Sequence, residues 1–175
     1  MIDFSRNHFS LFGLPERYRF DADALDRAYR ALQSDVHPDR HATGDDARRR
    51  AALQASARVN EAYRTLKDRV GRAEYLLQLH GVDAASATDS ALPFDFLERQ
   101  LERREAADRA AGDGDAAALA ALQAAVADEA AATEGRLAAL LDAGAWEAAR
   151  TPARELRFLA KLHADIDAMA AELDD

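Results

Sequence analysis

The apolar residues of the chain recur every three or four positions, which is the spacing of amphipathic helices and not of strands. In the first half this spacing predicts helices over residues 21–36, 45–67 and 70–79. The first of them carries its apolar side chains on one narrow stripe: Leu25, Tyr29, Leu32 and Val36. Pro38 and Gly44 interrupt the pattern between the first two helices, so the two form an antiparallel hairpin joined by a loop.

The second half shows the same helical spacing in three further stretches. The first runs over about residues 93–111, the second ends near residue 141, and the third begins near Trp146. Glycine-containing turns at 112–115 and 142–144 separate them. Because such short connections make neighbouring helices antiparallel, the pattern predicts a three-helix bundle.

A small, polar stretch separates the two halves and reads as a linker over residues 80–92. Its apolar residues, Val82 and Leu92, are expected to anchor it. The chain is therefore expected to be all-α, with a hairpin domain over residues 1–79 and a bundle over 93–175. Composition agrees, because alanine is plentiful while glycine (8) and proline (4) are scarce.

Charge is distributed unevenly between the two halves. Residues 1–79 hold 14 Lys/Arg and 12 Asp/Glu, a net charge of +2, whereas residues 80–175 hold 9 and 20, a net charge of −11. This asymmetry favours two units with different partners. The acidic half is not expected to bind nucleic acid, since phosphate contacts require positive potential.

Several classes of protein are excluded or disfavoured by what the chain contains. It has no cysteine, so disulfides, thiolate metal sites and thiol nucleophiles are excluded. No apolar stretch approaches the roughly 20 residues of a membrane span. The N-terminus lacks the continuous apolar run of a secretory signal, so a cytoplasmic location is expected.

No pattern of residues predicts an enzyme, a metal site or a cofactor site. Four histidines are scattered and are expected to be solvated surface residues: His8, His41, His80 and His163. Glu102 and Glu105 could form an acid pair on one helix. However, no nucleophile or glycine-rich phosphate loop accompanies them, so solvated charge is the better interpretation.

The tripeptide His37, Pro38 and Asp39 lies at the tip of the predicted hairpin. Alone, it fits equally well a loop turn in which proline fixes φ and the aspartate caps the next helix. Here it follows a helix whose solvent face carries Arg27 and Arg30, opposite the apolar stripe. The whole arrangement resembles a J-domain.

The resemblance implies a partner for this loop. In J-domains these residues contact the nucleotide-binding domain and interdomain linker of a DnaK-type chaperone and stimulate its ATPase, so this chain would hydrolyse nothing itself. Arg40 would belong to the same surface. The chemistry is suitable, since Pro38 stiffens the loop and the helix arginines, Arg27 and Arg30, steer docking electrostatically.

A closer resemblance covers nearly the whole chain. Residues 9–15 (FSLFGLP), 72–81 (RAEYLLQLHG), 100–105 (QLERRE) and 156–162 (LRFLAKL) resemble the HscB family of iron–sulfur co-chaperones. Some relatives carry a cysteine-based metal site near the N-terminus, which this chain cannot form, so it resembles the bacterial type. The resemblance implies that the bundle binds an IscU-type scaffold protein and delivers it to the chaperone HscA.

Carried over by position, the scaffold-binding residues would be Leu97, Leu101, Glu102, Glu105 and Phe158. Ordinary packing within the bundle is the alternative for the leucines and for the phenylalanine. Glu98 and Arg103 stand where the family tends to have apolar residues, so a smaller apolar patch is expected.

Two other functions remain open on the sequence alone. One is a general J-domain adaptor, whose bundle holds a different client or mediates dimerisation. The other is a purely structural helical protein, for which a His37→Gln substitution would change nothing in a chaperone assay.

Overall fold

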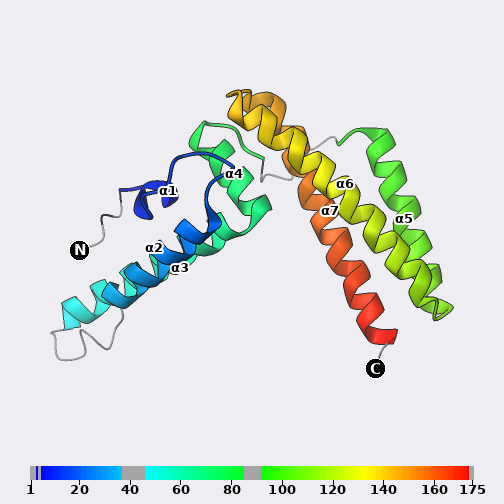
Figure 1. The fold of residues 1–175 in the computed structure, drawn as a ribbon, viewed down its shortest axis with the longest axis horizontal. Coiled ribbons are helices and arrows are strands. Elements are labelled where there is room, and N and C mark those ends of the chain that lie inside the picture. The colour runs from blue at the N-terminus through cyan, green and yellow to red at the C-terminus, as the bar shows by residue number, and fades with distance from the viewer. Residues whose placement is uncertain (1–2, 4, 37–45, 85–91, 174–175) are drawn as a thin grey trace. The chain divides into compact units, whose positions relative to one another are not determined.

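The computed structural model describes residues 3, 5–36, 46–84 and 92–173. Every regular element within these ranges is an α-helix, which confirms the predicted fold class. The chain divides into two compact units, Met1–Leu76 and Leu77–Asp175 (Figure 1).

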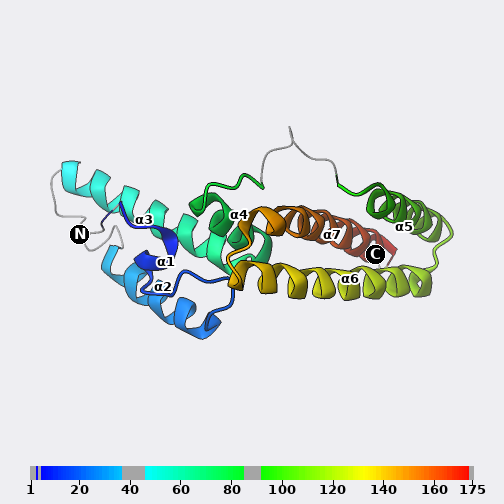
Figure 2. The same cartoon turned by 90° about the horizontal axis from the view of Figure 1, so that it is seen from above.

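The first unit is built around a helical hairpin. Its elements are α1 (His8–Leu11), α2 (Ala22–Val36), α3 (Asp46–Lys67) and most of α4 (Arg69–Leu79). Helices α2 and α3 lie side by side, as the views in Figure 1 and Figure 2 both show. Side chains that are almost fully buried form the core: Phe9, Tyr18, Leu25, Val59, Leu66 and Leu76. Burial of such side chains stabilises the hairpin by roughly 1.5–3 kcal/mol each.

The second unit contains the predicted three-helix bundle, with α5 (Phe94–Gly112), α6 (Ala116–Asp142) and α7 (Trp146–Leu173). The turns between them contain Gly114 and Gly144, whose φ values of 70° and 69° are in the left-handed region that favours glycine. Fully buried side chains in its core include Leu119, Val126, Leu137, Leu156, Leu159 and Ile166.

Residues 80–84 also belong to the second unit and fold against α7. Val82 and Ala84 are buried. The His80 ring stacks on Trp146 with 3.6 Å between centroids, and Arg157 donates a hydrogen bond of 3.2 Å to the carbonyl of Ala84. Val82 thus provides the expected apolar anchor, and the first residues of the predicted linker are ordered against the bundle.

Candidate functional site

The tripeptide His37, Pro38 and Asp39 and the neighbouring Arg40 lie outside the described residues. Helix α2, which precedes them in the chain, lies within the described residues, and the side chain of its Arg27 is exposed.

Arg30 on the same helix is also exposed. Arg27 donates a hydrogen bond of 3.1 Å to Asp21 near the start of α2. An exposed pair of this kind stabilises little, so the Arg27 guanidinium can exchange Asp21 for a partner's carboxylate at small cost.

Polar and aromatic side chains of α2 and α3 form a seam that holds the two helices against each other. The rings of Tyr29 and Tyr63 stack with centroids 3.9 Å apart. Asp26 accepts hydrogen bonds from Lys67 (2.8 Å) and from the Tyr63 hydroxyl (3.0 Å). These two hydrogen bonds, that of Lys67 foremost, hold the pKa of Asp26 below its usual value. Because the seam pairs specific side chains, it sets the register of the hairpin.

His8 is not a surface residue, which corrects the expectation from the sequence. It is 4% exposed and stacks on Tyr75, with ring centroids 4.0 Å apart. Its Nδ1 has no hydrogen-bond partner among the described residues. Burial, assisted by the positive charge of Arg58, lowers the pKa of His8 to about 4. The helical spacing could not show this contact, because His8 and Tyr75 are 67 residues apart in the chain.

On the second unit, the apolar residues carried over from the resemblance are exposed rather than packed. Leu97 is 40% exposed, Leu101 60% and Phe158 39%. We call these three residues the apolar patch. The ring of Phe158 meets the edge of the buried Phe96, with centroids 5.8 Å apart, so its position is set by α5. Ordinary core packing therefore does not account for these side chains.

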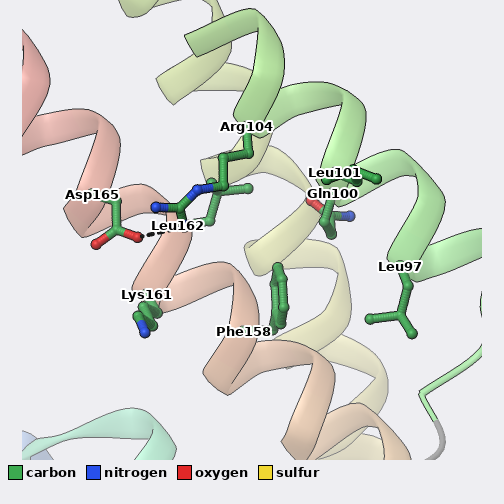
Figure 3. Close-up of a pocket in the computed structure, with 8 residues that line it drawn as sticks. All are labelled: Leu97, Gln100, Leu101, Arg104, Phe158, Lys161, Leu162 and Asp165. Atoms are coloured by element: carbon green, nitrogen blue, oxygen red, sulfur yellow. Dashed lines mark hydrogen bonds and ion pairs between the residues drawn. The ribbon is translucent and has the colours of Figure 1, made fainter. Parts of the chain in front are cut away.

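The apolar patch surrounds a small pocket between α5 and α7 (Figure 3). Its volume is about 170 Å³, below the roughly 300 Å³ at which small-molecule sites begin. The pocket therefore suits a single protruding side chain. Its lining residues are Leu97, Gln100, Leu101, Arg104, Phe158, Lys161, Leu162 and Asp165.

The charged groups at the pocket are not the expected carboxylates. Glu102 and Glu105 are exposed on α5 but do not line it. Instead the lining includes Arg104, Lys161 and Asp165, and Arg104 forms an ion pair of 3.2 Å with Asp165 (Figure 3). The sequence does place Lys161 one helical turn after Phe158, so its position on the same face of the helix could have been predicted. Pairing of Arg104 with Asp165 depends on the register between two helices, which spacing alone does not give.

Arg103 does not line the pocket. It forms an ion pair with Glu129 on α6 and donates a hydrogen bond of 3.0 Å to Gln100, so its guanidinium group links α5 to α6 within the bundle. Partial burial opposes ionisation of Glu129. Hydrogen bonds from Arg103, Gln100 and Arg99 nevertheless hold its pKa below the usual value. The apolar patch is therefore bounded by Arg104 and Lys161, and not by Arg103.

Two further properties apply to the described part of the chain. No described helix is at once long and apolar enough to cross a membrane. Among the described residues, no group of three or more His, Asp or Glu side chains is arranged to hold a metal ion.

Comparison with known proteins agrees with this geometry in both units. The model of the DnaJ domain matches residues 7–75, and that of the HSCB C-terminal oligomerisation domain matches residues 92–167. A protein of Burkholderia mallei named "Co-chaperone protein HscB homolog" is 44% identical over 174 residues, which cover 99% of each chain. The chain belongs to the HscB family.

Solved HscB structures share the fold of the whole chain. Chaperone HscB from Vibrio cholerae superposes with a TM-score of 0.86 at 36% identity, over 96% of this chain and 99% of the other. Human co-chaperone protein HscB gives a TM-score of 0.89 at 26% identity, over 95% of this chain and 83% of the other. As a member of the HscB family, the chain is a J-domain co-chaperone.

Proposed function

We propose that this co-chaperone binds an IscU-type iron–sulfur scaffold protein with its second unit. The protein delivers that scaffold to an HscA- or DnaK-type chaperone, and its J-domain stimulates the chaperone's ATPase. The role is in iron–sulfur cluster assembly, and the compartment is the cytoplasm. The protein is not itself an enzyme in this proposal, because ATP hydrolysis takes place on the chaperone.

The chaperone-binding surface comprises six residues: His37, Pro38, Asp39, Arg27, Arg30 and Arg40. The match to the DnaJ domain supports this assignment. The exposure of Arg27 and Arg30 on α2 supports it as well, since both guanidinium groups are accessible to an acidic partner surface.

The observation that carries the scaffold-binding proposal is the apolar patch around an open pocket on the bundle. Large apolar side chains left exposed together mark interaction surfaces in soluble proteins. Leu97, Leu101 and Phe158 come from two helices and meet at one pocket. A partner that inserts one apolar side chain there removes all three from water, at about 25 cal/mol per Å² of apolar surface.

Phe94 extends the same surface along α5. It is 79% exposed, the largest exposed fraction among the large apolar side chains of the described residues. Phe94 and Leu101 are seven residues apart, which is nearly two full helical turns, so both lie on one face of α5. Glu102 and Glu105, exposed on the same helix, are proposed as polar contacts outside the pocket.

Joining both binding surfaces in one chain explains how the protein would act. A scaffold held by the bundle is kept at high effective concentration near a chaperone held by the J-domain. Closure of the chaperone, triggered by the J-domain, then takes place while the scaffold is held close enough to be captured.

A second candidate function has a specific observation in its favour. The matched family model is described as an oligomerisation domain, so the apolar patch could instead join two copies of this chain. In that case a second copy of this chain would cover the apolar patch, and scaffold binding would compete with dimer formation. Light scattering on the wild type and the variant described next separates the two functions.

The test is scaffold binding by the full chain and a Leu101→Ser variant. Leu101 is 60% exposed, so its substitution should leave the fold intact, while the scaffold dissociation constant should rise about 10-fold through loss of roughly 1–2 kcal/mol of apolar burial. Leu53→Ser is the control, because Leu53 is equally apolar and 56% exposed but lies on α3. Equal binding by all three proteins would contradict the proposed site.

A further inference from the structure

The cationic side of the pocket is a feature that the apolar patch does not explain. Arg104 and Lys161 both line the pocket, and Asp165 is its only carboxylate among the described lining residues. Arg104 pairs with Asp165 at 3.2 Å. Lys161 is exposed and forms no ion pair with any described residue, so its ammonium group is available to a partner.

The local charge at the pocket is opposite to that of the surrounding unit. Residues 80–175 carry 9 Lys/Arg and 20 Asp/Glu, a net charge of −11. The lining of the pocket holds two cations and one carboxylate, a net charge of +1. A positive group beside an apolar pocket on an otherwise negative surface is complementary to an apolar side chain that has a carboxylate next to it. A cationic segment would be repelled by the rest of the unit.

We propose that Lys161 is a specificity-determining residue of the scaffold site. It pairs with a carboxylate on the scaffold that lies next to the apolar side chain seated in the pocket. Lys161 follows Phe158 by three residues on α7, so both face the partner from the same side of the helix. This inference rests on the proposed function, because it names the chemistry that the apolar patch selects.

The structure also limits how large the effect can be. Lys161 is exposed, so water and salt screen its attraction to a partner carboxylate. A Lys161→Glu change replaces this attraction by repulsion and should weaken scaffold binding by about 5- to 20-fold at low ionic strength. Most of the loss should be in the association rate, and it should shrink to about 2-fold or less at high ionic strength.

The experiment measures association and dissociation rates of a purified IscU-type scaffold on the full-length protein. It is run at roughly 50 mM and 500 mM salt, where the screening length falls about three-fold. Arg50→Glu is the matched control, because it makes the same change in net charge at an exposed position on α3. Circular dichroism confirms that both variants are folded.

The expected result is slower, salt-sensitive association for Lys161→Glu and unchanged rates for Arg50→Glu. If the wild type binds the scaffold and Lys161→Glu binds equally well, the inference is overturned while the proposed function stands. Equal weakening by both variants also overturns it, since total charge would then be the cause. If the wild type binds no scaffold at all, the proposed function is overturned, and the inference with it.

Discussion

The buried His8 makes the stability of the first unit dependent on pH. The residue is 4% exposed, its ring stacks on Tyr75, and its Nδ1 has no hydrogen-bond partner among the described residues. Protonation would place a charge in this apolar site beside Arg58. Burial and that neighbouring charge lower the pKa of His8 from 6.5 to about 4.

The direction of the effect follows from which state binds the proton. Between pH 6.5 and about 4 the unfolded chain protonates His8 while the folded unit does not, so acidification favours unfolding. The loss begins as the pH falls below 6.5 and is complete below the folded pKa. One pKa unit corresponds to about 1.4 kcal/mol, so the full loss is about 3 kcal/mol.

The assay is the chemical unfolding of the full-length protein between pH 7.5 and pH 4, with NMR titration of the histidine rings to give the folded pKa directly. His8→Phe keeps a ring for Tyr75 to stack on and removes the titrating group, so it should remove most of the acid sensitivity. His163→Gln, in the second unit, should leave that sensitivity unchanged. A folded pKa of His8 near 6.5, or equal acid sensitivity in His8→Phe, would show that burial of His8 does not cause the acid sensitivity.

Three further predictions concern single side chains. Arg72 donates hydrogen bonds to the carbonyls of Leu66 and Tyr18, and its guanidinium lies over the Phe20 ring. Arg72→Ala should therefore lower the free energy of unfolding, measured by denaturant unfolding, by about 2–3 kcal/mol. Arg72→Lys should recover only part of this loss. Glu129→Gln should cost about 1–2 kcal/mol at pH 7. This difference should vanish as the pH falls through the lowered pKa of Glu129, since its ionised form is the one stabilised. Phe94→Ala should weaken scaffold binding several-fold in calorimetry without lowering the melting temperature, because Phe94 is 79% exposed.

The helices could be predicted because each rests on local information. Apolar residues at helical spacing placed Leu25 on the inward stripe of the first helix, and Leu25 is buried. Turns containing Gly114 and Gly144 separated the bundle helices within one or two residues of their observed ends. These signals lie within a few residues of the structure they determine, so one sequence is enough to see them.

The features that were missed depend on contacts between segments far apart in the chain. The burial of His8 is caused by Tyr75 on α4. Val82 was expected to anchor the linker, but the partners Trp146 and Arg157 on α7, which meet residues 80–84, were not predicted. The charges at the pocket depend on how α5 and α7 are aligned. Helical spacing gives the face on which a residue lies, but not the partner that meets that face. The resemblance identified the apolar patch, whereas the pairing of Arg104 with Asp165 became evident only from the packed bundle.

The most direct test of the central claim is steady-state ATP hydrolysis by HscA with an IscU-type scaffold present. Wild type and His37→Gln are added in turn, and each measurement is repeated without scaffold. We expect strong stimulation by the wild type that depends on the scaffold, and none by His37→Gln. Stimulation that is the same with and without scaffold would contradict scaffold delivery, and full activity of His37→Gln would contradict the assignment of the J-domain loop.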